Sequence, residues 1–241
     1  MMLCLDAGNS RLKYGLFADG AWLVQGALNY TELGQLGARL PRPPQGIIIC
    51  NVAGAQVAVE LEHFANGMAL TPHWFASSAS ACGVQNGYAL PAQLGADRWA
   101  ALIAARGLHA GNAVVVMSGT ATTIDVLDAS GQFCGGVILP GLSLMQAALA
   151  TGTAGLPLAT GSFDTLPRNT DDAISSGAIQ ATLGAIERIA AQTFANSPKA
   201  DNLCLVSGGA AEVLLPHLKV PSRYIGNLVL DGLARYGAQL N

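Results

Sequence analysis

The chain has 241 residues, of which 51% are hydrophobic and only 11% are charged, and its formal net charge is −3. The length is enough for one large domain or two of ordinary size, and the low charge predicts a large buried surface with a further apolar face in an oligomer. A slightly acidic chain without a basic cluster argues against a nucleic-acid partner.

A long stretch without charged side chains covers residues 129–163. Pro140, Gly141 and Pro157 interrupt it, so no run of about 20 apolar residues is left and we expect no contact with a membrane. The five cysteines are scattered and the four histidines show no ligand spacing, which predicts a reducing compartment and no zinc site. We therefore expect a cytoplasmic protein, and the apolar start at residues 1–5 is too short for a signal peptide.

In chain order, apolar runs predict strands at Met2–Leu5, Leu12–Phe17, Gly46–Val52, Val114–Met117, Thr122–Leu127, Gly136–Leu139 and Leu203–Ser207. Composition and helical spacing predict helices at Asp97–Gly107, Leu142–Ala150, Thr170–Phe194, Ala210–Leu218 and Leu228–Leu240. Asn169 or Thr170 is expected to cap the longest of these helices, with Asp171 and Asp172 in its first turn. The mixture of strands and helices predicts an α/β architecture.

The first predicted strand runs into Asp6-Ala7-Gly8-Asn9-Ser10, and Lys13 follows three residues later. Gly8 permits a tight turn in which backbone N–H groups approach a ligand closely, and Lys13 is a point charge suited to phosphate. A carboxylate such as Asp6 belongs beside an anion-binding turn if a divalent metal lies between it and a phosphate. The alternative is a plain β-turn, in which Asp, Gly, Asn and Ser are common for local reasons.

A similar pattern of strand, glycine, small polar residue and second strand recurs at Val116-Met117-Ser118-Gly119-Thr120-Ala121, about half of the chain length away. The repetition predicts a duplicated domain, with one domain at residues 1–111 and the other at 112–241, where Gly111 and Asn112 mark a turn. Two glycine-centred turns facing each other would form a phosphate clamp. The alternative is chance recurrence in a chain with 29 glycines.

Two further segments carry candidate chemistry. Ser207-Gly208-Gly209 follows a strand and opens a predicted helix, the geometry that directs backbone amides toward a ligand. Gly95-Ala96-Asp97-Arg98 begins another predicted helix, where Asp97 is either a general base or a residue that stabilises the helix start. Arg98 is suited to bidentate anion binding. We interpret Asp125 as a charge at the end of a strand.

Six motifs in this order resemble those of the type III pantothenate kinases, and they cover nearly the whole chain. They are Asp6-Ala7-Gly8-Asn9-Ser10, Gly95-Ala96-Asp97-Arg98, Gly119-Thr120-Ala121-Thr122-Thr123, Gly135-Gly136-Val137-Ile138-Leu139-Pro140-Gly141, Asn169-Thr170 with Ser176-Gly177, and Ser207-Gly208-Gly209. The resemblance implies an α/β fold of two duplicated actin-like domains with a cleft between them, in the acetate and sugar kinase/Hsp70/actin superfamily. It also implies a homodimer with active sites near the subunit interface, and ATP-dependent phosphorylation of pantothenate, the first step toward coenzyme A.

The resemblance assigns roles to particular residues. The family's ATP-phosphate motif falls on Asp6, Ala7, Gly8, Asn9, Ser10, Arg11, Leu12 and Lys13, with a further ATP contact at Thr120 and the adenosine end at Ser207, Gly208 and Gly209. The pantothenate contacts fall on Tyr88, Gly95, Ala96, Asp97, Arg98 and Thr170, and the catalytic base falls on Asp97. Asp6 would hold Mg²⁺, directly or through water. Arg98 would either orient the pantothenate carboxylate or neutralise transition-state charge.

One position departs from the family pattern. Many members have Asp two residues before the Gly-Thr pair, where it binds a monovalent cation such as K⁺ or NH₄⁺, and this chain has Met117 there. A thioether does not replace a carboxylate as a ligand for a hard cation, so we predict weak or absent potassium dependence through that site. The sequence leaves two alternatives to a pantothenate kinase: a kinase of the same fold for another small hydroxy compound, and a non-catalytic nucleotide-binding regulator.

Overall fold

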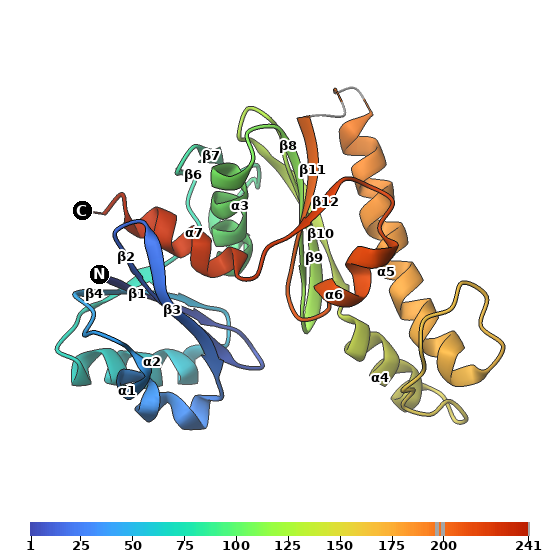
Figure 1. Cartoon of the computed structure of the whole chain (residues 1–241), viewed down its shortest axis with the longest axis horizontal. Coiled ribbons are helices and arrows are strands. Elements are labelled where there is room, and N and C mark those ends of the chain that lie inside the picture. The colour runs from blue at the N-terminus through green and yellow to red at the C-terminus, as the bar shows by residue number, and fades with distance from the viewer. Residues whose placement is uncertain (196–197, 199–200, 241) are drawn as a thin grey trace. The chain divides into compact units, whose positions relative to one another are not determined.

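A computed structural model of the chain describes residues 1–195, 198 and 201–240. The chain divides into two compact units (Figure 1). The first unit contains Met1–Leu108 together with the segment that begins at Asn227, and the second contains His109–Gly226. The expected division at residues 111 and 112 assigned the whole C-terminal part to the second domain, so the structure differs from it in the position of the last helix.

The first unit is built on a five-stranded sheet in the order β3-β2-β1-β4-β5. Its strands are β1 (Met2–Ala7), β2 (Leu12–Ala18), β3 (Ala21–Leu28), β4 (Gly46–Asn51) and β5 (Pro72–Phe75). The pairs β1–β2 and β2–β3 are antiparallel, whereas β1–β4 and β4–β5 are parallel. The central strand β1 is buried over residues 3–7, as its continuous apolar run predicts.

Helices cover the sheet of the first unit. The 3-10 helix η1 (Tyr30–Gln35), α1 (Leu36–Arg39) and α2 (Ala55–Gly67) share one apolar core with the sheet, to which Leu3, Leu5, Ile49 and Leu61 contribute. α3 (Ala96–Leu108) and α7 (Leu228–Gly237) lie side by side, green and red in Figure 1, and both contact β4. The short strands β6 (Ser80–Ala81) and β7 (Val84–Gln85) and the 3-10 helix η2 (Pro91–Gln93) precede α3.

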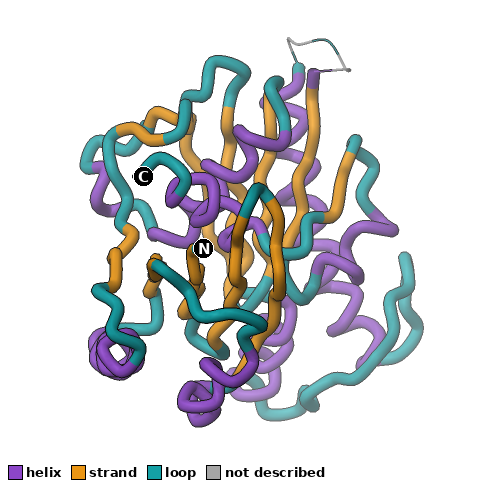
Figure 2. The backbone as a smooth tube through the Cα atoms, turned by 60° about the vertical axis from the view of Figure 1, so that its left-hand side comes forward, coloured by secondary structure: helices purple, strands orange, loops and turns teal. Residues whose placement is uncertain are grey.

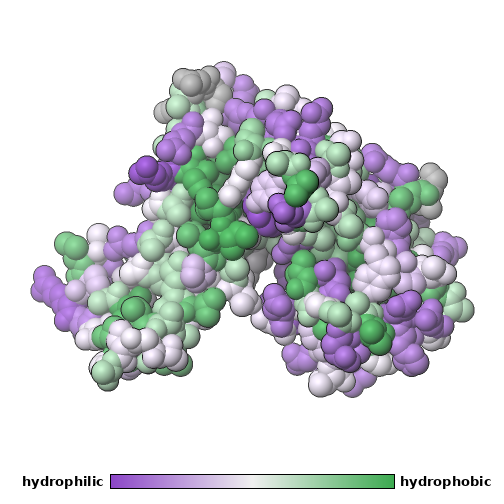
Figure 3. Space-filling model, turned by 180° about the vertical axis from the view of Figure 1, so that it is seen from behind, coloured by the Kyte–Doolittle hydropathy of each residue, from purple (hydrophilic) through white to green (hydrophobic). Residues whose placement is uncertain are grey.

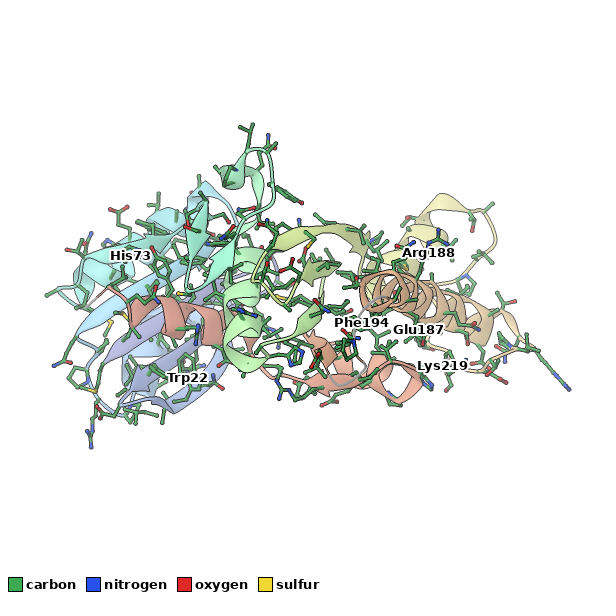
Figure 4. The ribbon with its side chains drawn as sticks, turned by 90° about the horizontal axis from the view of Figure 1, so that it is seen from above. Trp22, His73, Glu187, Arg188, Phe194 and Lys219 are labelled. Carbon is green, nitrogen blue, oxygen red and sulfur yellow. The ribbon has the colours of Figure 1, made fainter. Side chains whose placement is uncertain are left out.

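The C-terminal helix α7 joins the first unit through its apolar side chains. Leu228, Leu230 and Leu233 are fully buried, and α7 packs against α3 and β1. The indole Nε1 of Trp22 on β3 donates a hydrogen bond of 2.9 Å to Oδ1 of Asp231, and Figure 4 shows Trp22 beside this helix. Because these contacts join residues far apart in the chain, sequence spacing alone could not assign α7 to this unit.

The second unit repeats the architecture with a five-stranded sheet in the order β10-β9-β8-β11-β12. Its strands are β8 (Asn112–Ser118), β9 (Ala121–Leu127), β10 (Phe133–Pro140), β11 (Asn202–Ser207) and β12 (Ser222–Tyr224). The pairs β8–β9 and β9–β10 are antiparallel, whereas β8–β11 and β11–β12 are parallel. The order and sense of pairing therefore match the first sheet strand by strand, and Figure 2 shows helices alongside the strands of both sheets. This agreement supports the predicted duplication.

The helices of the second unit are α4 (Leu142–Gly152), α5 (Thr170–Phe194), α6 (Ala211–Leu214) and the 3-10 helix η4 (Leu215–His217). α5 packs on β8 and β9 through a core that includes Val114, Val116 and Ile186. Asn169 caps α5, because its side chain accepts a hydrogen bond of 2.9 Å from the backbone N–H of Asp172. Farther along α5, Glu187 accepts a hydrogen bond from the backbone N–H of Lys219, and both residues are labelled in Figure 4.

The predicted strands are all present, and four of the predicted helices are found nearly as expected. The helix predicted at Ala210–Leu218 is wrong in length, since α6 ends at Leu214 and η4 follows. The break coincides with Pro216, whose ring interrupts a continuing α-helix. Within the described part of the chain, no helix combines the length and the hydropathy needed to cross a bilayer.

Candidate active site

Asp6 lies near the end of β1 and is only 8% exposed. In the register of the sheet, Lys13 of β2 is its neighbour on one side and Cys50 of β4 is its neighbour on the other. Burial raises the pKa of Asp6 to about 6; the charge of Lys13 opposes this shift, and the carboxylate of Asp97 adds to it. The fold of the first unit therefore brings Asp6, Lys13 and Asp97 close enough for their charges to interact.

Hydrogen bonds fix the base of the turn that follows β1. The carbonyl of Ala7 accepts a hydrogen bond of 3.0 Å from the N–H of Val52, and the N–H of Gly8 donates one of 3.3 Å to the carbonyl of Arg11. The hydroxyl of Tyr30 donates a hydrogen bond of 2.6 Å to the carbonyl of Gly8. The following residues at the tip, 9–11, are exposed. The turn therefore presents an ordered backbone to solvent, as an anion-binding turn requires.

Asp97 lies in the first turn of α3, which begins after Gly95. The carbonyl of Gly95 accepts the first helical hydrogen bond, from the N–H of Trp99, so Gly95 and not Asp97 occupies the capping position. Oδ1 of Asp97 accepts a hydrogen bond of 2.8 Å from the N–H of Arg98. A Cβ atom on residue 95 would lie 2.7 Å from Oδ1 of Asp97, so glycine leaves the space that this carboxylate occupies.

Arg98 and Tyr88, both predicted contacts of pantothenate, lie against each other. The guanidinium of Arg98 is buried, with the residue 4% exposed, and Nη1 donates a hydrogen bond of 3.0 Å to the hydroxyl of Tyr88. Cζ of Arg98 also lies 5.7 Å from the centre of the Tyr88 ring, within reach of a cation–π interaction. Together with Asp97, these residues place one acidic and one basic group on the first turn of the same helix.

In the second unit, the turn at Gly119 and Thr120 connects β8 to β9. The N–H of Gly119 donates to the carbonyl of Ala121 at 2.9 Å, and the N–H of Gly141 donates to the carbonyl of Thr120 at 2.9 Å. The hydroxyls of Ser118 and Thr122 form a buried hydrogen bond of 2.8 Å beneath the turn. The turn is thus built like the one after β1, with its carbonyls held by neighbouring segments.

The Ser207-Gly208-Gly209 segment packs directly on the strand that leads into this turn. The N–H of Ala210 donates a hydrogen bond of 3.1 Å to the carbonyl of Ser118. Gly208 has a φ of +101°, and a Cβ atom there would lie 2.2 Å from the same carbonyl oxygen, so only glycine fits. The second unit therefore brings these predicted nucleotide contacts next to the Gly119–Thr120 turn. The helix that follows, α6, is too short to supply the dipole that the sequence suggested.

Met117 and Thr123 are paired across β8 and β9. In the described part of the chain, the buried hydroxyl of Thr123 has no hydrogen-bond partner. Asp125, on the same face of β9, is only 1% exposed and lies within the strand, so the interpretation of Asp125 as a charge at a strand end is wrong. Because β9 continues to Leu127, Asp125 lies inside the strand and its side chain is buried.

Thr170 lies at the start of α5, where it lines a cavity of about 1000 Å³ in the second unit. Most of the lining is apolar, with Met145, Leu149 and Ile174 among the residues, whereas Arg168 supplies a positive charge. The sequence did not indicate this cavity, since its walls come from three segments that meet only in the fold. It likewise gave no sign of Tyr30, whose contact with Gly8 spans 22 residues.

Among the described residues, no group of three or more His, Cys, Asp or Glu side chains is arranged to hold a metal ion. A metal held entirely by protein side chains is therefore not indicated there. The arrangement around Asp6 instead offers one buried carboxylate with a second, that of Asp97, close to it. Such a site is suited to a cation that takes its remaining ligands from a bound phosphate and from water.

Solved structures that resemble this chain share its fold at low sequence identity. A conserved Campylobacter jejuni protein assigned to the Baf family of transcriptional activators aligns with a TM-score of 0.64 and 23% identity over 99% of this chain and 98% of that chain. A Sinorhizobium meliloti protein assigned as a 2-dehydro-3-deoxygalactonokinase aligns at 0.63 and 15%, over 100% and 99%. MreB5 of Spiroplasma citri bound to AMPPNP aligns at 0.50 and 8%, over 99% and 96%. The fold is therefore the duplicated actin-like fold of sugar kinases and MreB.

Sequence relatives identify the family. The type III pantothenate kinase of Aromatoleum aromaticum is 50% identical over 236 residues, which cover 97% of this chain and 96% of the relative. The type III pantothenate kinase of Dechloromonas aromatica is 47% identical over 236 residues, which cover 97% of both chains. The family model of type III pantothenate kinases matches residues 2–192. This chain therefore belongs to the type III pantothenate kinase family.

Proposed function

We propose that this chain transfers the γ-phosphoryl group of ATP to the primary hydroxyl of pantothenate, giving 4′-phosphopantothenate for coenzyme A biosynthesis, with Asp97 as the general base. Membership of the family supports the reaction. The observation that supports the residue assignment is the convergence of Asp6, Lys13 and Asp97 in the first unit. We also propose a cytoplasmic location, where the five free cysteines would stay reduced.

We assign ATP to two sets of residues, one in each unit. In the first unit, Asn9, Ser10 and Lys13 would bind phosphate oxygens at the turn whose base is held by hydrogen bonds to Ala7 and Gly8. In the second unit, Thr120 would contact ATP, and Ser207-Gly208-Gly209 would accept the adenosine end, because glycines allow a flat base to lie close to the backbone.

Asp6 is the residue that we assign to Mg²⁺, directly or through water. The repulsion between the carboxylates of Asp6 and Asp97 disfavours two negative charges without a cation, so the donor set fits Mg²⁺ bound with substrate phosphates. When bound, Mg²⁺ neutralises charge on the phosphate oxygens.

In the proposed reaction, the carboxylate of Asp97 accepts the proton of the pantothenate hydroxyl. The hydroxyl oxygen forms the new bond to the γ-phosphorus, and the bond from that phosphorus to the β–γ bridging oxygen breaks, so that ADP leaves. Most of the catalysis in such a transfer comes from positioning and charge neutralisation. The hydrogen bond from the Arg98 N–H holds the Asp97 carboxylate at the helix start.

The remaining substrate contacts follow from the same helix start. Tyr88, Gly95, Ala96 and Arg98 would bind pantothenate, with Thr170 of the second unit. Arg98 supplies a fixed positive charge, since its guanidinium is buried against Tyr88. Arg98→Lys distinguishes its two candidate roles: a raised KM for pantothenate identifies a carboxylate contact, and a lowered kcat identifies charge neutralisation in the transition state.

We propose further that the protein is a homodimer and that its second copy covers an apolar face of the second unit. Ile138 on β10, Leu144 and Leu149 on α4, and Leu158 are 63%, 49%, 40% and 66% exposed, and α4 has no buried residue. The space-filling view shows hydrophobic residues, in green, gathered on this unit (Figure 3). Such a face is typical of a protein interface.

The test of the proposed function is a coupled assay of ADP release with a panel of acceptors. Pantothenate should support turnover, whereas sugars and other hydroxy acids should not. Turnover with another acceptor but not with pantothenate would contradict the substrate, and ATP binding without turnover of any acceptor would indicate a non-catalytic protein.

A further inference from the structure

Tyr30 reaches back to the phosphate turn from a segment that the motifs do not include. It lies at the start of η1, directly after β3, and its hydroxyl donates a hydrogen bond of 2.6 Å to the carbonyl of Gly8. This is a short hydrogen bond for a hydroxyl donor. As the glycine of the turn, Gly8 is the residue whose backbone conformation can change most easily. The bond connects it to Tyr30 and so to the apolar core of the first unit.

Tyr30 is itself held in place. Its partly buried ring packs against the core that contains Leu3 and Leu5. On the backbone side, the N–H of Asn29 donates a hydrogen bond of 3.0 Å to Oε2 of Glu32, and Nη2 of Arg39 donates one of 2.6 Å to Oε1 of Glu32. The segment that carries Tyr30 is therefore fixed by local contacts.

The Tyr30 hydroxyl stays protonated at neutral pH and so remains a donor. Burial raises its pKa to about 12, and the negative charges of Asp6 and Glu60 add to the shift. Because a carbonyl oxygen can only accept a hydrogen bond, the protonated hydroxyl of Tyr30 is the donor and the Gly8 carbonyl is the acceptor.

Fixing the carbonyl of Gly8 also fixes the N–H of Asn9, because both belong to one planar trans peptide and point in opposite directions. Without such a contact, the glycine before this peptide would allow it to rotate to another orientation. The carbonyl of Ala7 and the N–H of Gly8 are anchored by Val52 and Arg11. Tyr30 thus anchors the next peptide along the chain, the first one of the exposed tip.

We propose that Tyr30 is a positioning residue for the phosphates of ATP: its hydroxyl sets the orientation of the Gly8–Asn9 peptide so that the N–H of Asn9 can donate to a phosphate oxygen. The inference rests on the proposed function of this turn as a phosphate site. It adds to that function a residue that touches neither the nucleotide nor pantothenate.

The test compares Tyr30→Phe with Tyr236→Phe in the full chain. Tyr236 of α7 is a partly buried tyrosine of the same unit, and its ring packs edge-on against Phe75 of β5. Binding of MgADP and of adenosine is measured by calorimetry, without pantothenate. We expect Tyr30→Phe to weaken MgADP binding about three- to tenfold, the effect of one lost hydrogen bond, and to leave adenosine binding unchanged. Tyr236→Phe should change neither.

Equal MgADP affinity in Tyr30→Phe and the wild type would overturn the proposal, and so would an equal loss for MgADP and adenosine. If Tyr30→Phe melts below the assay temperature, nuclear magnetic resonance of the wild type replaces it. The Asn9 amide signal should then shift on addition of MgADP and not on addition of adenosine, and an unmoved signal would contradict the proposal.

The test of Tyr30 and the test of the proposed function can fail independently of each other. A wild type that binds MgADP but does not phosphorylate pantothenate would contradict the function and leave the role of Tyr30 to be decided by the binding data. An active kinase whose MgADP affinity does not depend on Tyr30 would contradict only the role of Tyr30.

Discussion

Asp6 and Asp97 come from a strand and a helix far apart in the chain, yet they interact in the folded first unit. Burial is the main cause of the raised pKa of Asp6, and the negative charge of Asp97 contributes to it against the opposing charge of Lys13. Two carboxylates that repel each other beside a lysine form a site that gains from binding a cation and a phosphate together.

Asp97→Asn should lower kcat for pantothenate phosphorylation by about 10²–10⁴, because an amide cannot accept the hydroxyl proton. The KM for ATP should change little. The coupled ADP-release assay measures both, with Asp19→Asn, an exposed aspartate of the same unit, as the matched control. Activity of Asp97→Asn within threefold of the wild type would refute the assignment of the base.

Gly95→Ala should displace the Asp97 carboxylate, because the added Cβ would lie 2.7 Å from its Oδ1. Since misplacing a catalytic group by about 1 Å can cost up to about a hundredfold, we expect kcat to fall by about tenfold or more while the protein remains folded. Steady-state kinetics and a thermal melt provide the measurement. Gly37→Ala, a glycine of α1 with no atom within 4 Å of its added Cβ, should have no kinetic effect.

We predict weak or absent potassium activation in the wild type, and Met117→Asp should introduce or strengthen it. The substitution restores a carboxylate next to Thr123, whose buried hydroxyl has no hydrogen-bond partner in the described part of the chain. Rates in sodium, potassium and ammonium salts at equal ionic strength make the comparison. Strong potassium activation of the wild type itself would show that Met117 does not remove the cation site.

Ile138→Lys should dissociate the proposed homodimer, because it puts a charge on the apolar face formed by β10 and α4. Sedimentation velocity should show the wild type as a dimer and this variant as a monomer. Val59→Lys on α2 is the matched control, since Val59 is 64% exposed and Ile138 is 63% exposed. A wild type that sediments as a monomer, or an Ile138→Lys dimer as tight as the wild type, would count against this face.

Asp231→Asn should stabilise the protein at neutral pH. Burial raises the pKa of Asp231, and the hydrogen bond from Trp22 opposes the shift. A carboxyl whose pKa is higher in the folded state contributes stability while protonated, and this contribution is lost as the pH rises through the folded pKa. Asparagine keeps an acceptor for Trp22 and stays neutral.

The free energy of unfolding of Asp231→Asn should therefore equal that of the wild type in acid and exceed it at pH 7. The difference should not be larger than about 1 kcal/mol, since partial exposure screens the charge. Urea denaturation across this pH range measures it, with Asp19→Asn showing no such trend. If the difference in the free energy of unfolding between Asp231→Asn and the wild type became smaller as the pH rises, the assigned direction of the pKa shift would be contradicted.

The sequence by itself determined the buried strands of this protein and the positions of its two glycine-centred turns. Continuous apolar runs such as Leu3–Leu5 and Val114–Val116 predict central strands, because only such strands are buried on both faces. Strand β3 was not predicted from an apolar run. It lies at the edge of its sheet, and most of its residues alternate between exposed and partly buried. The Gly8 and Gly119 turns could be predicted because a tight turn depends on local residue types, above all on glycine.

Only the tertiary structure decided which distant residues meet. The packing of α7 on β1 and α3, the electrostatic interaction of Asp97 with Asp6, and the hydrogen bond from Tyr30 to Gly8 all join segments that are separated along the chain. Local periodicity records which side of a strand or helix is buried, but not which partner covers it. The resemblance to the family motifs predicts the residues of the site, and the fold adds Tyr30 as a proposed positioning residue that lies outside every motif.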